Sequence, residues 1–169
     1  MSKSLGSELN DDLSRRLSGE NLKTFAEKVI LIATVDNAGR PHAAMLSYLE
    51  VVARDRRNIR LATYEDSSTT ENMRRNGKAT ISIIDERIAY YIKGSVVELK
   101  REMTCARHNS KLNLHVEEVL ADEVNEEFEP GAYVSSGITY QNPNRAAQIL
   151  KAREVIKELL RDEDQVEGL

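Results

Sequence analysis

Short turns separate the apolar, β-branched runs of this sequence, and this spacing restricts the fold more than any other feature. The run at 29–35 ends at turn residues 36–39, a second run covers 42–52, and a turn at 54–58 leads into a third run at 59–64. Turns this short cannot hold the crossover that joins two parallel strands. The first half of the chain therefore predicts an antiparallel meander.

Further β-prone runs follow a short helical pattern at 68–76. Residues 79–84 and 88–99 indicate strands joined by a turn at 85–87, residues 111–122 alternate between apolar and polar side chains, and residues 132–140 contain one more short β-prone stretch. Strands spaced by short turns favour a small antiparallel barrel over a doubly wound sheet. The expected fold class is mainly β, in the α+β sense, with flanking helices.

Helical spacing marks the two ends of the chain. Leu9, Leu13 and Leu17 recur every four residues, and a second apolar set follows at 22–26. Asn142 and Pro143 have the types that open a helix, and apolar residues at helical spacing follow them. We expect one domain over residues 1–169, with N-terminal helices in 1–28, a barrel over 29–140 and a C-terminal helix over 142–162.

Composition argues against several functional classes. The net charge of −4 disfavours a nonspecific nucleic-acid binder, because such proteins need a basic face to displace counterions from phosphates. One cysteine and three dispersed histidines suggest neither a disulfide nor a metal site. No stretch approaches the roughly 20 apolar residues of a membrane span, and residues 1–10 lack a signal-peptide core. We therefore expect a cytoplasmic protein without metal, membrane or nucleic-acid partners.

The segment 61–77 is the candidate functional site. An apolar strand runs into a hydroxyl-rich loop, residues 67–70, and a short helix that ends at Gly77. A helix start exposes unpaired N–H groups and a partial positive charge, so this arrangement can hold a phosphate. Ser68 and Glu71 also have the spacing of a capping box, and Gly77 can end the helix in a left-handed conformation. From the residues alone, anion binding and simple capping both stay open.

Three stretches resemble the pyridoxamine-phosphate-oxidase-like family of flavin-binding split barrels. LIATVDNAGRPH at 31–42 is similar to the family's first hairpin, LATYEDSSTTENM at 61–73 to its strand, phosphate loop and helix, and ATISI at 79–83 to the next strand. VSSGITY at 134–140 resembles a segment near the end of some members. The resemblance implies a six-stranded antiparallel split β-barrel that forms a homodimer, with FMN bound in a groove between the subunits.

The resemblance also implies which residues contact the cofactor. By matching position, these residues lie on the neighbouring strand, on the strand before the loop, in the hydroxyl-rich loop and on the helix. They are Ser47 and Tyr48, then Thr63, then Ser67, Ser68, Thr69 and Thr70, and finally Asn72. His42 is either a groove residue near the cofactor or a half-buried strand histidine. No catalytic residue is assigned, since the chemistry would belong to the flavin.

The sequence departs from the oxidase members at the phosphate loop. Those members carry a basic pair in the loop and another on the preceding strands, where this chain has Ser68, Thr69, Ser47 and Val52. Pyridoxamine-phosphate oxidation is therefore not expected. The leading hypothesis is an oxidoreductase-like protein that binds FMN, or a related flavin or deazaflavin, and acts on an unidentified small substrate. The alternatives are a non-catalytic flavin- or haem-binding protein for storage or sensing, and a dimerisation scaffold with an empty groove.

Overall fold

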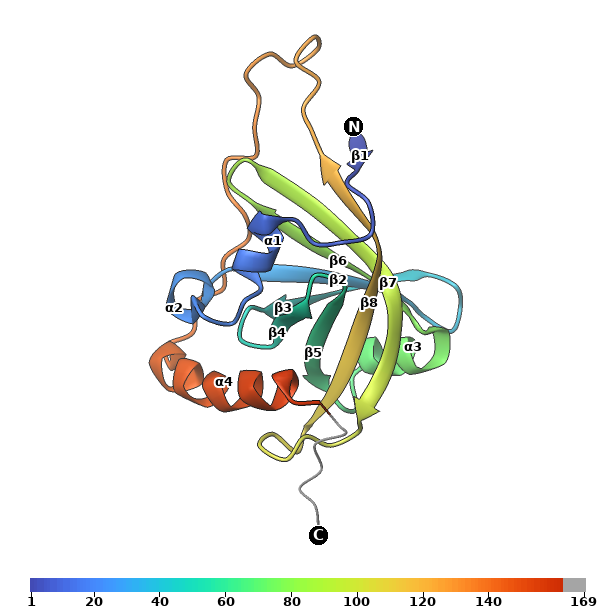
Figure 1. The fold of residues 1–169 in the computed structure, drawn as a ribbon, viewed down its shortest axis with the longest axis vertical. Coiled ribbons are helices and arrows are strands. Elements are labelled where there is room, and N and C mark those ends of the chain that lie inside the picture. Colours follow the sequence, from blue (N-terminus) through green and yellow to red (C-terminus); the bar gives the residue numbers. More distant parts are fainter. Residues whose placement is uncertain (163–169) are drawn as a thin grey trace.

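The computed structural model describes residues 1–162, which form eight strands and four helices (Figure 1). The strands are β1 Ser2–Ser4, β2 Val29–Val35, β3 Pro41–Ser47, β4 Val51–Asp55, β5 Asn58–Tyr64, β6 Lys78–Asp85, β7 Ile88–Lys100 and β8 Asn109–Asp122. The helices are α1 Asp11–Arg16, α2 Leu22–Phe25, α3 Ser68–Asn76 and α4 Arg145–Leu160. The two predicted N-terminal helices, the helix after the hydroxyl-rich loop and the C-terminal helix are all present.

The strands form one curled antiparallel sheet in the order β3-β2-β6-β7-β8-β5-β4, and β1 pairs with β8. Within residues 1–162 no ladder joins β3 to β4, so the sheet curls without closing (Figure 1). A mainly β split barrel with flanking helices is therefore confirmed as the fold class.

The expected six strands become eight, for two reasons. The single strand predicted over 42–52 breaks between β3 and β4, where the Glu50 N–H donates to the Ser47 carbonyl at 3.1 Å in a tight turn. The added strand β1 consists of polar residues with no β pattern, and backbone pairing such as Ser2 with Asp122 holds it to β8. Pairing of this kind leaves no signal in local sequence.

Alternation along the strands builds the core. In β6, Ala79, Ile81 and Ile83 are buried, while Thr80 and Ser82 between them are partly exposed. The same period of two on neighbouring strands turns a continuous apolar surface inward, and burial of that surface stabilises the fold by roughly 25 cal/mol per Å².

Helices cover the ends and one outer face of the sheet. Leucines of the α1 region and Met73 of α3 enter the inner core, and Figure 1 shows α1 and α3 at opposite ends of the curled sheet. α4 lies against the outside of β4 and β5, where Ile156 packs in a second cluster with Val52 and Ala62. The α3 end of the barrel is the end that carries the hydroxyl-rich loop.

The β-prone stretch 134–140 does not form a strand. It forms one isolated bridge, between Lys28 and Thr139, and its other backbone bonds go to the two neighbours of Lys28 and to Arg87. Those bonds join Arg87 N–H to Val134 O at 2.8 Å, Val29 N–H to Ile138 O at 3.0 Å and Tyr140 N–H to Glu27 O at 2.7 Å. The segment is extended but never follows one strand long enough to form a ladder.

The C-terminal helix starts later than predicted. The Asn142 side chain accepts the Asn144 N–H at 2.8 Å in a turn that precedes the helix, and α4 begins at Arg145. Its last helical residue is Leu160, close to the predicted end at 162.

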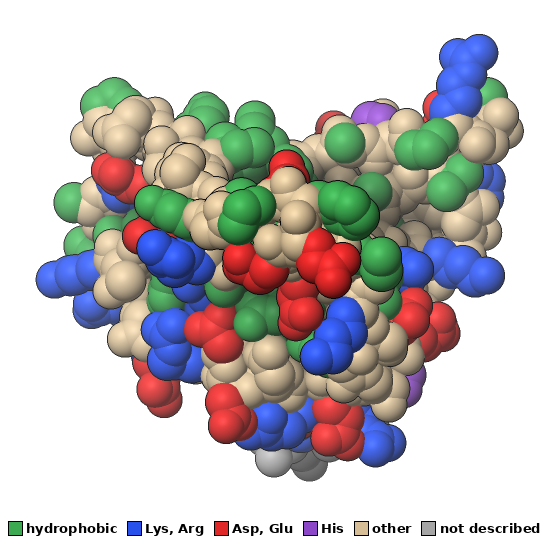
Figure 2. Space-filling model, turned by 90° about the horizontal axis from the view of Figure 1, so that it is seen from above, with side chains coloured by type: hydrophobic (Ala, Val, Ile, Leu, Met, Phe, Trp, Pro, Cys, Tyr) green, Lys and Arg blue, Asp and Glu red, His purple; other side chains and the backbone are tan. Residues whose placement is uncertain are grey.

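The stretch from 117 to 129 carries seven acidic residues and no basic residue. Its strand residues pair with β7, and the remainder is an exposed loop. Figure 2 shows acidic side chains gathered near the centre of the face seen from above. No helix within residues 1–162 is long and apolar enough to span a membrane.

Candidate functional site

The hydroxyl groups around the start of α3 bond to one another and to the backbone. Thr63 Oγ1 lies 2.6 Å from Thr70 Oγ1, and the Ser67 hydroxyl lies 3.0 Å from the same Thr70 oxygen. Both Ser67 and Thr70 also donate to the Tyr64 carbonyl, at 2.8 and 2.6 Å. The structure thus brings three of the predicted site residues together, in a network that ties β5 to α3.

Ser67 is the residue that caps α3, and Ser68 is not. The Ser67 side chain accepts the Thr70 N–H at 3.2 Å, as an N-cap residue does, and Ser68 is the exposed first residue of the helix. The Ser68/Glu71 capping box is therefore wrong by one residue. Gly77 ends the helix with φ of 64°, the left-handed conformation predicted for it.

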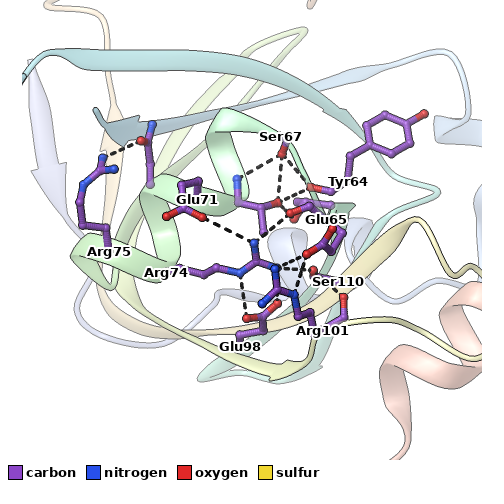
Figure 3. Close-up of polar contacts among 12 residues, drawn as sticks. Tyr64, Glu65, Ser67, Glu71, Arg74, Arg75, Glu98, Arg101 and Ser110 are labelled. Atoms are coloured by element: carbon purple, nitrogen blue, oxygen red, sulfur yellow. Dashed lines mark hydrogen bonds and ion pairs between the residues drawn. The ribbon is translucent and has the colours of Figure 1, made fainter. Parts of the chain in front are cut away.

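Arg74 occupies the space below the loop and is fully engaged (Figure 3). Its guanidinium donates to both carboxylate oxygens of Glu98, at 2.9 and 2.7 Å, and to the Glu65 carbonyl at 2.9 Å. A further bond reaches Ser110 Oγ at 3.1 Å, and Arg101 donates to Glu65 Oε1 at 2.7 Å. The bonds from Arg74 lower the pKa of the Glu98 carboxyl, so this acid stays ionised.

Asn72 and His42 lie at the junction of α3 with β2 and β3. Asn72 is buried, donates to Thr34 Oγ1 at 3.0 Å and accepts a bond from Arg75 at 2.7 Å. His42 pairs with Thr34 across the β2–β3 ladder and is partly exposed. Paired residues share one side of a sheet, so His42 lies on the side that α3 covers. Asn72 anchors the helix through its own side chain.

Ser47 and Tyr48 lie apart from the other predicted residues. Ser47 is at the far end of β3 from His42, a separation of about 17 Å at the usual rise per residue, and its hydroxyl donates to Glu50 at 3.3 Å. Tyr48 is only 3% exposed and stacks on Phe25 at 4.8 Å in the core. Burial raises the pKa of the Tyr48 phenol. The structure places this ring among core residues.

Three neighbouring strands present an outer face that is uncharged except for the exposed Lys78 at the start of β6. The part of this face without Lys78 is called the uncharged outer face. Alternation and register put the following side chains on the outside of β3, β2 and β6: Pro41, Ala43, Met45, Ser47, Val29, Leu31, Ala33, Val35, Thr80, Ser82 and Ile84. In a chain with 31% charged residues, such a face is unusual. A pocket of about 140 Å³ lies at its Ser47 end, lined by Val29, Leu31, Ser82, Ile84 and residues 136–138.

Comparison with known proteins identifies the family. A sequence model described as pyridoxamine 5'-phosphate oxidase matches residues 19–130, which include every strand from β2 to β8 and all of α3. This chain belongs to the pyridoxamine 5'-phosphate oxidase family. The resemblance in the three short stretches is thereby confirmed over most of the chain.

A curated protein and several solved structures are similar to parts of this chain. The uncharacterised protein YclD of Bacillus subtilis is 35% identical over 85 residues, which cover 50% of this chain and 55% of that protein, so the match spans only about half of the relative's length. A Lactobacillus delbrueckii protein proposed to be a pyridoxamine 5'-phosphate oxidase is 17% identical, with a TM-score of 0.56, and the match covers 69% of this chain and 98% of that one. HupZ of Group A Streptococcus is 15% identical, with a TM-score of 0.53 and coverage of 79% and 99%. These structures support the fold.

The phosphate of FMN, the cofactor implied by the resemblance, does not fit the residues at α3. The first turn offers the Ser68 and Thr69 N–H groups, but the Ser67 and Thr70 hydroxyls are engaged, and Arg74 is bound by Glu98 and Glu65. A dianion needs charged donors to offset its desolvation. We therefore derive no reaction step through this cofactor.

The residues that bind Arg74 could not be predicted from the sequence. Glu98 lies 24 positions away on β7 and Ser110 lies 36 positions away on β8. No spacing rule links positions so far apart, so only the fold could place them here. Within residues 1–162 no group of three His, Cys, Asp or Glu side chains has metal-binding geometry.

Proposed function

We propose that this chain is a flavin-binding protein that holds its ligand between two copies of itself and has an oxidoreductase-like role. The observation that carries the proposal is the position of the family match: residues 19–130 contain α3, the uncharged outer face and all of the predicted site residues. The substrate would be a small molecule, and the redox chemistry would belong to the flavin.

The uncharged outer face supports the location between two copies. β3 is an edge strand whose outward residues Ala43 and Met45 are exposed, and Met45 has 57% of its surface open. Interface cores are depleted of charge and enriched in methionine. A second copy seated on this face would bury Met45 and turn the pocket beside Ser47 into part of a groove.

A non-catalytic role is the second candidate, because Arg74 is unavailable to a ligand phosphate. In that case the groove would store or sense a flavin, a deazaflavin or haem. A barrel that only dimerises, with an empty groove, would bind none of them.

The visible spectrum of the purified protein, followed by flavin titration, tests the proposal. Flavin absorbance or saturable quenching of added flavin fluorescence is the expected result. A Soret band would favour the haem-binding candidate, and the absence of both chromophore and titratable binding would contradict flavin binding.

Met45→Glu tests the location. A charge on the proposed interface should give a monomer with flavin affinity reduced at least about tenfold, since buried unpaired charge is strongly unfavourable. Val97→Glu is the matched control, because Val97 is an outward residue of β7 with the same 57% exposure. Dimers that persist in Met45→Glu would place the interface elsewhere.

A further inference from the structure

The start of α3 is surrounded by acidic side chains. From residue 61 to residue 72 the chain carries Glu65, Asp66 and Glu71 and no basic residue. Ion pairs join Glu65, Glu71 and Glu98 to Arg74 and Arg101. With Asp66, the segment and its partners hold four carboxylates and two guanidinium groups, a net charge of −2. The partial positive charge of a helix start is about half an elementary charge and does not offset this.

Arg74 cannot be released to a ligand at low cost. Its side chain is 18% exposed, and Glu98 binds it through two parallel bonds of 2.9 and 2.7 Å. To contact a phosphate, Arg74 would have to leave Glu98 as a partly buried carboxylate without its partner, which is strongly unfavourable. Arg75 bonds instead to Asn72 and to the Val35 carbonyl, and Figure 3 shows it on the far side of α3 from Ser67.

The hydrogen-bond donors that remain at the start of α3 suit an uncharged acceptor group of a ligand. The Ser67 and Thr70 hydroxyls already donate to Tyr64 O, so the first-turn N–H groups of Ser68 and Thr69 remain for a ligand. A hydroxyl or carbonyl oxygen can accept from such groups without bringing charge into the acidic surroundings.

We propose that the start of α3 excludes a dianionic phosphate, so that the site selects a dephosphorylated flavin, riboflavin, over FMN. This inference rests on the proposed function for the identity of the ring, but the exclusion of phosphate rests on the charges and contacts of α3 alone.

Parallel titrations with riboflavin and FMN test the selectivity. The wild-type protein should bind FMN at least about fivefold more weakly than riboflavin at low salt, and added salt should narrow the gap. Asp66→Asn and Glu71→Gln should each tighten FMN binding about two- to fivefold and leave riboflavin binding unchanged. Glu129→Gln, an exposed acid on the loop after β8, is the matched control and should change neither affinity. Ser68→Arg should tighten FMN binding at least about tenfold, because it adds a charged donor at an exposed position.

A titration with inorganic phosphate tests the exclusion without any flavin. In proton–nitrogen NMR spectra, the Ser68 and Thr69 amide signals of the wild-type protein should show no saturable shift, while those of Ser68→Arg should saturate. Saturable phosphate binding by the wild type, or tighter binding of FMN than of riboflavin, would overturn the inference. A protein that binds neither flavin but also shows no phosphate shift would contradict the proposed function and support the exclusion at α3.

Discussion

At the scale of single residues, Asp85 joins the N-terminal segment to the barrel. It lies at the end of β6 and is bonded by Lys28 and by Arg16, the latter at 3.0 Å. Burial raises the pKa of Asp85, but the bonds from Lys28, the Glu86 N–H and Arg16 outweigh it and lower the pKa from 3.8 to about 2. The ionised form is therefore favoured in the folded protein.

Because the pKa of Asp85 differs between the folded and unfolded states, the free energy of unfolding depends on pH. A carboxyl with a depressed folded pKa contributes stability above its unfolded pKa and loses it as the pH falls through the folded value. The stability difference between wild type and Asp85→Asn should be full above about pH 4 and should shrink toward pH 2. Urea unfolding at a series of pH values measures it. A difference that stays constant between these two pH values would contradict the assignment.

The sequence predicts the conformation and contacts of some residues and not of others. The role of Gly77 as the residue that ends α3 was predictable, because it depends only on the ability of glycine to adopt a positive φ, and Gly77 has that φ. The bonds between Arg74 and Glu98 were not predictable, since they join α3 to β7, which meet only in the fold. Tyr48 is similar: the sequence predicts it within one strand over 42–52, but it lies in the break between β3 and β4, and its ring stacks on Phe25 in the core.

At the scale of elements, the choice of cap for α3 can be tested directly. Ser67 and Ser68 are adjacent serines, and only Ser67 bonds to the Thr70 N–H. Ser67→Ala should lower the free energy of unfolding by about 1 kcal/mol, and Ser68→Ala should change it by less than about 0.5 kcal/mol. Chemical denaturation of the two variants decides between them. Equal losses, or a larger loss for Ser68→Ala, would restore the capping box that the sequence suggested.

The docking of α4 depends on a buried lysine. Lys111 of β8 is 1% exposed and donates to the carbonyls of Glu158 and Arg161 at 2.9 and 2.7 Å, where a cation is favoured at a helix end. Lys111→Met should destabilise the protein by roughly 1–3 kcal/mol and increase hydrogen exchange in α4. Lys157→Met on the exposed side of α4 is the control. Unchanged exchange in α4 would contradict the role of Lys111.

Element types were predictable where local pattern decides, as in the alternation of β6 and the leucine spacing of α1. Boundaries failed where another part of the chain supplies the backbone partners. Residues 134–140 bond to two separate segments, residues 27–29 and Arg87, and β1 forms only because β8 extends to meet it.

At the scale of the whole molecule, the two proposals rest on the uncharged outer face and on the acidic start of α3. On the proposed account, a second copy packs on the face of β3, β2 and β6, and the charges around α3 disfavour a bound phosphate. Short turns were enough to predict antiparallel hairpins such as β2–β3 and β4–β5, because they leave no room for a crossover between parallel strands. They could not predict the pairing of β2 with β6 or of β5 with β8. They could not predict which outer face stays free of charge, since that depends on the order β3-β2-β6.

Sedimentation velocity with added riboflavin, followed in the visible flavin band, tests the central claim most directly. The account predicts that the flavin absorbance sediments with the protein at the mass of a dimer of this chain. Flavin that stays behind the protein boundary, or that sediments with a single chain, would contradict a ligand held between two copies.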